Sequence, residues 1–194
     1  MEVSLSSQQK VHLSPEEYLV IERGAEIKSE YFNGEMFAMV GASREHNLIV
    51  ANMTRELTQQ LKGKPCEAYS NDMRVRIPAT GLYTYPDVVV VCSEPIFEDE
   101  HVDTLLNPTL IVEVLSESTE SYDRGKKFSN YRTVESLSEY ILVAQDEYRI
   151  ERFLKQADGT WLYSETHSLK GQVQVTSIQC VLTLKEVYER VSLA

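Results

Sequence analysis

Hydrophobic residues recur at helical spacing in two segments of the N-terminal third of the chain. The first segment begins at Ser14, which suits a helix N-cap, with proline next and Glu17 placed to close a capping box. A short helix to about Glu22 is predicted. The second segment runs from Ser43 to about Gly63, and its apolar positions follow a 3.6-residue period. These positions are Leu48, Ile49, Met53, Leu57 and Leu61.

Alternating patterns predict strands on either side of the second helix. Before it, the Asn33-Gly34 pair lies between alternating flanks over residues 27–40, which is typical of a β-hairpin with a type I′ turn. After it, residues 73–77 alternate between apolar and basic side chains. They predict a half-buried strand with two arginines facing away from the core, Arg74 and Arg76.

Three longer apolar segments, residues 85–91, 110–115 and 140–144, predict the centre of a sheet. Their side chains are apolar at successive positions, as expected of strands that are covered on both faces. A helix is predicted over residues 123–134, between the second and third of these strands. The remaining predictions are a hairpin that joins 149–154 to 161–164, a strand over 172–181 and a closing helix over 184–191.

The order of these elements predicts one α/β domain over residues 14–194, with a mixed β-sheet flanked by helices and extended by β-hairpins. A chain of 194 residues leaves little room for a second core. Residues 1–13 are expected to form a flexible N-terminus.

The composition, with 42% hydrophobic and 25% charged residues, is that of a globular protein with a real core. The longest apolar run, residues 88–92, is far shorter than the roughly 20 residues of a transmembrane helix. Because the N-terminus also lacks a signal-peptide pattern, a cytoplasmic location without a membrane partner is expected. Cys66, Cys92 and Cys180 are far apart and form no C-x-x-C pair, so neither a disulfide framework nor a structural zinc site is expected.

The formal net charge of −11 opposes non-specific nucleic-acid binding through bulk charge. It leaves room for a local basic surface, because positive charge is concentrated between residues 44 and 76. An acidic loop over residues 94–103 is expected to be solvated. The candidate nucleic-acid contacts are Arg44, Arg74, Arg76 and, on the predicted helix 123–134, Lys126.

Two acidic residues interrupt the most hydrophobic strands. Asp87 begins one strand and Glu113 lies inside the next, and a buried carboxylate is costly unless it is paired, hydrogen-bonded or bound to a metal. If the strands are neighbours, the two carboxylates can converge on a divalent cation, and hard oxygen ligands suit Mg²⁺ or Mn²⁺. The alternative is that Asp87 caps a turn and Glu113 pairs with an arginine.

The helix predicted after Glu113 carries a third candidate, Lys127. Asp123, Lys127 and Tyr131 are four residues apart and therefore share one helical face. From this face Lys127 could reach over the strand ends and orient or deprotonate a water, or neutralise charge on a phosphate. The alternative is a surface ion pair between Asp123 and Lys127.

The order of elements and the residues on them resemble the PD-(D/E)XK nuclease superfamily. Within it, the chain is similar to a widespread prokaryotic family of restriction-endonuclease-like proteins over nearly its whole length, from about Ser14 to Val191. The resemblance is carried by Tyr31-Phe32-Asn33-Gly34-Glu35, Glu45-His46-Asn47, Asp72-Met73-Arg74-Val75-Arg76, Tyr85-Pro86-Asp87-Val88, Glu113-Val114-Leu115-Ser116-Glu117-Ser118-Thr119, and Asp123 with Lys127 and Tyr131.

The resemblance implies phosphodiester hydrolysis by a metal-activated water. It also implies a Mg²⁺ or Mn²⁺ site made by Asp87, Glu113 and the backbone carbonyl of Val114. The superfamily pattern places a lysine two residues after the glutamate, and this chain has Leu115 there. Lys127 is therefore the candidate for a catalytic lysine that has migrated to the following helix.

Four more residues are expected to support this site. Glu30, on the first hairpin, matches an acidic position of the family and could bind a second metal or a water. His46, near the start of the second helix, could contact a phosphate, orient a ligand or be structural. Asp123 and Tyr131 share the helical face of Lys127.

The favoured function is a metal-dependent endonuclease that acts on DNA, and a homodimer would match the two-fold symmetry of a duplex. Leu115 and the negative net charge also leave open a nuclease-like domain that binds nucleic acid or a protein partner without turnover. A third hypothesis is a hydrolase of small phosphorylated molecules, which a negative surface would hinder less than a polymer.

Overall fold

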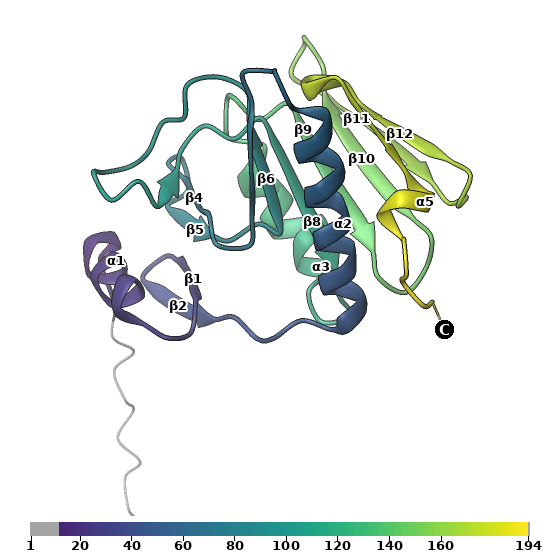
Figure 1. Cartoon of the computed structure of the whole chain (residues 1–194). Helices are drawn as coiled ribbons and strands as arrows, with labels where there is room; N and C mark the ends of the chain where they lie inside the picture. The colour runs from purple at the N-terminus through teal and green to yellow at the C-terminus, as the bar shows by residue number, and fades with distance from the viewer. Residues whose placement is uncertain (1–11, 194) are drawn as a thin grey trace, which may run out of the picture.

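The computed structural model describes residues 12–193 (Figure 1). Most of the expected flexible N-terminus, residues 1–11, lies outside the described residues. Leu13 is attached to the first hairpin, because its N–H donates to the Gly34 carbonyl (3.0 Å) and its own carbonyl accepts from the Tyr31 hydroxyl (2.8 Å). The folded part of the chain therefore begins before the expected boundary at residue 14.

A six-stranded sheet forms the centre of the fold, in the order β11-β10-β9-β8-β6-β3. Strands β8 and β9 are parallel and the other neighbours are antiparallel, so the predicted mixed sheet is confirmed. The strands are β3 (Glu67–Ser70), β6 (Val88–Val91), β8 (Leu110–Leu115), β9 (Glu139–Ala144), β10 (Ile150–Lys155) and β11 (Trp161–Thr166).

One face of this sheet is covered by α2 (Arg44–Gln60), which crosses β6 and β8 in Figure 1. Met53 and Leu57 on the predicted apolar stripe of α2 are buried in one cluster with Val112 and Val114 of β8. The same cluster takes in two strands and a helix near the C-terminus, which cover the rest of this face. They are β12 (Gln172–Val175), β13 (Cys180–Thr183) and α5 (Leu184–Val187).

The opposite face of the six-stranded sheet packs against a second, five-stranded sheet of order β2-β1-β5-β4-β7. Its strands are β1 (Ser29–Phe32), β2 (Glu35–Ala38), β4 (Arg74–Ile77), β5 (Leu82–Thr84) and β7 (Thr104–Leu105). Helix α1 (Pro15–Gly24) has the predicted capping box and lies on β1, where the rings of Tyr18 and Tyr31 stack with centroids 4.9 Å apart.

The predicted helix over residues 123–134 is wrong in detail. The chain forms three short pieces there, namely α3 (Glu120–Tyr122), the π-helical turn η1 (Asp123–Lys127) and α4 (Phe128–Tyr131). Gly125 in the middle disfavours a regular helix, and π-turns of this kind occur often at functional sites. The wider turn still leaves Lys127 Nζ 3.6 Å from Asp123 Oδ1.

The single strand predicted over residues 172–181 is also wrong, since the segment is an antiparallel pair, β12 and β13. The turn between them is held by the buried Glu139 carboxylate, which accepts hydrogen bonds from the N–H groups of Thr176 (3.2 Å) and Ser177 (2.8 Å). Because Glu139 lies on β9, this turn depends on a partner that the local sequence does not contain. The closing helix is shorter than predicted and ends at Val187.

Strands β3, β5 and β7 had no counterpart in the sequence analysis. β5 and β7 have three and two residues, too few for a periodic pattern, and β3, with the sequence Glu-Ala-Tyr-Ser, shows no alternation of apolar and polar residues. Within residues 12–193, no helix is both long enough and apolar enough to cross a membrane.

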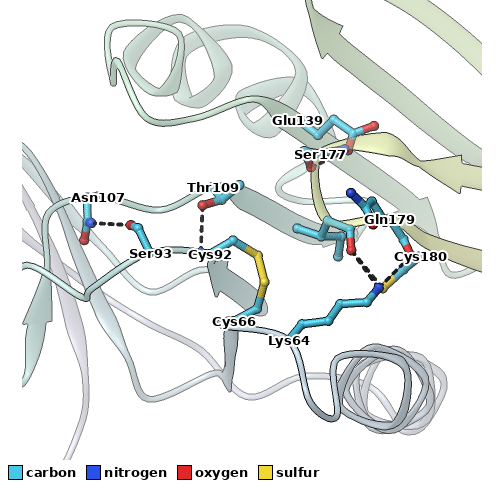
Figure 2. Close-up of a disulfide and its surroundings, with 11 residues drawn as sticks. Lys64, Cys66, Cys92, Ser93, Asn107, Thr109, Glu139, Ser177, Gln179 and Cys180 are labelled. Carbon is cyan, nitrogen blue, oxygen red and sulfur yellow. Dashed lines mark hydrogen bonds between the residues drawn. A yellow bond between two sulfur atoms is a disulfide. The ribbon is translucent and has the colours of Figure 1, made fainter.

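The expectation that the cysteines form no disulfide is wrong, because Cys66 and Cys92 are joined (Figure 2). Strands β3 and β6 pair from Glu67 with Val91, and the two cysteines are the next pair in this register, with Cα atoms 4.0 Å apart. Their separation of 26 residues hides the pairing in the sequence, and the β3–β6 ladder creates it. Cys180 is a buried free thiol.

We expect the disulfide to stabilise the fold by closing this loop in the unfolded chain. Replacing Cys66 with serine should lower the free energy of unfolding by about 3 kcal/mol, measured by urea denaturation. Wild-type protein in dithiothreitol should lose a similar amount. Equal stability of the oxidised, reduced and Cys66→Ser proteins would contradict the prediction.

Candidate active site

Asp87 directly precedes β6, and Glu113 lies on the neighbouring strand β8. β6 and β8 pair antiparallel, and Asp87 and Glu113 directly flank the last pair of this ladder, Val88 with Val112. The prediction that the two acidic strands are sheet neighbours is therefore confirmed. The side chain of Asp87 reaches β8 directly, since its Oδ2 accepts a hydrogen bond from the Val114 N–H (2.7 Å).

The Asp87 carboxylate is oriented from two sides. While Oδ2 binds Val114 on β8, Oδ1 lies 2.9 Å from Nε2 of His46 on α2. His46 has this position because Ser43 is the N-cap of α2, and the Ser43 hydroxyl accepts a hydrogen bond from the His46 N–H (3.0 Å). His46 and the Val114 N–H together fix the orientation of the Asp87 carboxylate.

Glu113 is almost completely buried, with 4% of its surface exposed. Its Oε1 accepts a hydrogen bond from the Tyr131 hydroxyl (2.7 Å) and lies 2.9 Å from Lys127 Nζ. Burial raises the pKa of Glu113 to about 8, and the Asp123 and Asp87 carboxylates add to this increase while Lys127 opposes it. At that pKa the protonated acid is favoured at neutral pH, and additional positive charge next to Glu113 would favour the charged carboxylate.

Lys127 is buried between three carboxylates rather than paired on the surface. Its Nζ lies 2.9 Å from Glu113, 3.2 Å from Glu30 and 3.6 Å from Asp123. Burial acts to lower the pKa of Lys127, but the three carboxylates hold that pKa well above its ordinary value. The alternative of a solvent-exposed Asp–Lys helix pair is thus wrong, because only 6% of Lys127 is exposed.

Thr84 is the neighbour of this site that the sequence analysis missed. It is fully buried on β5, and its hydroxyl donates to Glu30 Oε1, the same oxygen that contacts Lys127. A threonine within the short strand before Pro86 carries no distinctive pattern. Only the pairing of β1 with β5 brings it to Glu30.

The donor set fits one divalent cation with hard oxygen ligands. Glu113, Glu30 and Asp123 surround the ammonium of Lys127, and Asp87 is close enough to Glu113 to raise its pKa, so negative charge is in excess. No group of three or more His, Cys, Asp or Glu side chains is preformed as a metal cage within residues 12–193. A cation held by two carboxylates, a backbone carbonyl, waters and a substrate phosphate needs no such cage, and Mg²⁺ is often bound in this way.

The candidate nucleic-acid contacts differ in how accessible they are. Arg74 is only 3% exposed, and its guanidinium is held by Thr104 (2.9 Å), the Tyr85 hydroxyl (2.8 Å) and Asp103 (3.0 Å). Its predicted outward orientation is wrong, since the outer face of β4 is covered by α1 and the β7 loop. It is not retained as a nucleic-acid contact.

The other three candidates reach the surface to different extents. Arg76 is partly buried and pairs with Glu98. Arg44, at the start of α2, is well exposed and lies 3.1 Å from Glu45. Lys126 is exposed on η1, next to the buried Lys127.

A cavity of about 530 Å³ opens beside the carboxylates, between the start of α2 and the ends of β8 and β9. Its charged lining is mainly acidic, with one arginine, Arg149, among four carboxylate residues. The carboxylates are those of Glu45, Glu117, Glu120 and Asp146. This side of the site therefore disfavours a polyanion.

Comparison with known families decides the affiliation of the chain. The model of the family Uma2, described as "Putative restriction endonuclease", matches residues 15–185. The chain belongs to this family. Two uncharacterized proteins of Synechocystis sp. are also similar: sll1609 is 38% identical over 84% of this chain and 92% of its own length, and slr1290 is 40% identical over 91% of each.

The fold is likewise that of a solved protein. A crystal structure from Anabaena variabilis, described as a putative nuclease belonging to DUF820, matches 93% of this chain and 99% of its own, with a TM-score of 0.76 at 18% identity. The expected restriction-endonuclease-like α/β fold and the expected family are thereby confirmed.

We expect Lys127 to be essential for stability. Replacing it with alanine would leave Glu113, Glu30 and Asp123 buried without a cation, so the free energy of unfolding should fall by about 3 kcal/mol. Lys126→Ala is the matched control, because it removes an exposed lysine from the same turn. Urea denaturation of both variants tests this, and equal effects would contradict the buried ion cluster.

Proposed function

We propose that this protein is a metal-dependent endonuclease that hydrolyses phosphodiester bonds in DNA. The observation that carries the proposal is the placement of Asp87 and Glu113 beside the last pair of the β6–β8 ladder, with Lys127 Nζ 2.9 Å from the Glu113 carboxylate. Membership of the family described as "Putative restriction endonuclease" supports the reaction class. We also propose that the metal is Mg²⁺ or Mn²⁺ and that the substrate is DNA.

In this proposal Asp87, Glu113 and the Val114 carbonyl hold the cation, and Glu30 is a candidate for a second metal or a water. When bound, the divalent cation would supply an activated water and neutralise charge on the phosphate. His46 and the Val114 N–H fix the two oxygens of Asp87, so that the carboxylate is oriented before a ligand arrives. Tyr131 and Lys127 orient Glu113 in the same way.

Lys127 takes the role of the lysine that the superfamily pattern places two residues after the glutamate. Leu115 occupies that position and is buried in the core, 3% exposed, so it cannot contribute a charge. The ammonium of Lys127 is instead brought to Glu113 from η1. There it can stabilise negative charge that develops on the phosphate while water adds to phosphorus and the bridging P–O bond breaks.

Cleavage of supercoiled plasmid and of single-stranded DNA at low salt tests the proposal. We expect nicking with Mg²⁺ or Mn²⁺ and none with EDTA. Asp87→Asn and Glu113→Gln should each lower the rate by about 100-fold or more, because each removes a metal ligand. Lys127→Gln should also lower it, provided that the variant remains folded.

Glu94→Gln, which changes an exposed carboxylate after β6, is the control and should cleave like the wild type. Cleavage that persists in Asp87→Asn and Glu113→Gln would point to a contaminating nuclease. Hydrolysis of a small phosphodiester without cleavage of DNA would favour a hydrolase of small phosphorylated molecules.

A nuclease-like domain that binds without turnover is the second candidate. It is favoured by the three carboxylates that already hold Lys127, since an ammonium so engaged contributes less charge to a phosphate. This candidate expects DNA or protein binding that is unchanged in Glu113→Gln. A homodimer, if one forms, would bring two sites to the two strands of a duplex.

A further inference from the structure

The hairpin of β1 and β2 turns one face to α1 and the other to the candidate active site. Tyr31 and Met36 are opposite each other and pack with Tyr18 of α1. Glu30 and Phe37 are the next pair in the register, so they share the opposite face. Because Glu30 on that face reaches Lys127, Phe37 lies beside the site.

Phe37 presents its ring to solvent at this position. Phe37 is 49% exposed, whereas Glu30, directly opposite it, is mostly buried. The Cβ atoms of two such opposite residues on antiparallel strands are only about 5 Å apart, so the exposed ring is close to the buried carboxylate. Strand β2 is the edge of its sheet, so the ring has a neighbouring strand on one side only. An exposed aromatic ring next to catalytic carboxylates is a surface on which an unpaired base can stack.

The same hairpin places a cation near Asp87. Lys28 Nζ donates to the Asn71 carbonyl (3.0 Å), and the N–H of Asn71 donates to the Asp87 carbonyl (3.0 Å). The only carboxylate paired with Lys28 in the described residues is Asp72, at 2.7 Å, and the Asp72 side chain is 87% exposed. An ion pair this exposed is weak, so a phosphate can replace the Asp72 carboxylate.

The charges around the carboxylates favour a substrate path on this side. The cavity beside the start of α2 is lined by four carboxylate residues and one arginine, and although Glu45 and Glu120 are paired with arginines, its acidic lining disfavours a phosphate backbone. The hairpin side offers Lys28 for a phosphate and Phe37 for a base. A nucleic-acid strand whose phosphate contacts Lys28 and whose base stacks on Phe37 must have at least one base that is not stacked on its neighbours.

The geometry points to the β1–β2 hairpin as the arm that holds a single strand of nucleic acid, with Phe37 stacked on an unpaired base and Lys28 on a neighbouring phosphate. This inference rests on the proposed nuclease function and specifies its substrate. It implies a preference for single-stranded or locally unpaired DNA over an intact duplex, because a base stacked between its neighbours inside a duplex offers no free face to Phe37.

Fluorescence anisotropy with a labelled 20-nucleotide strand and with its duplex, at low salt and with Ca²⁺ as the metal, tests the inference. We expect tighter binding of the single strand, and a loss of about ten-fold or more in that affinity for Phe37→Ala. Phe37→Trp should restore the affinity, because it restores a stacking surface. In a plot of the logarithm of the affinity against the logarithm of the salt concentration, Lys28→Gln should reduce the magnitude of the slope by about 0.7. This is the value for one phosphate contact on a single strand.

Leu162→Ala is the matched control, since Leu162 is exposed to a similar extent (55%) on β11, at the far edge of the six-stranded sheet. It should bind like the wild type. Wild-type binding and cleavage with unchanged affinity in Phe37→Ala would overturn the role of the hairpin and leave the nuclease proposal standing. A wild-type protein that neither binds nor cleaves any of these DNAs would overturn both.

Discussion

The buried ammonium of Lys127 is the constraint on which the site depends. It joins three carboxylates from separate elements, Glu30 on β1, Glu113 on β8 and Asp123 on η1. Removing these charges from water costs several kcal/mol per ion, and only close mutual attraction in a medium of low polarity offsets that cost. The five-stranded sheet, the six-stranded sheet and the π-turn must therefore be in place together before the cluster is stable.

The cluster contains more carboxylates than its single ammonium can neutralise. A cluster made only for stability would have balanced charges, whereas here burial and the neighbouring acids raise the pKa of Glu113 to about 8. Perturbed groups of this kind are typical of functional sites, and a divalent cation would relieve the excess negative charge. The π-turn is part of the same arrangement, because it carries both Asp123 and Lys127.

The sheets divide the surroundings of the site into two unlike sides. On the side of α2 and the strand ends, acidic residues line a cavity, and on the other side the β1–β2 hairpin carries Lys28 and Phe37. A net charge of −11 is compatible with nucleic-acid binding only if the backbone avoids most of this surface. The local arrangement of charge then matters more than the total.

The sequence by itself determined the long elements and the chemical candidates. Capping residues and strong periodicity located α1, α2, the Asn33-Gly34 hairpin and the apolar strands, and the cost of burying a charge singled out Asp87 and Glu113. The tertiary structure decided what depends on contacts distant in the sequence. Examples are the burial of Arg74 under α1, the Cys66–Cys92 disulfide across β3 and β6, the turn held by Glu139, and the contact of Thr84 with Glu30. The local sequence pattern predicts on which face of a helix or strand a side chain lies. Which residue that side chain contacts depends on the elements packed against it, and these are distant in the sequence.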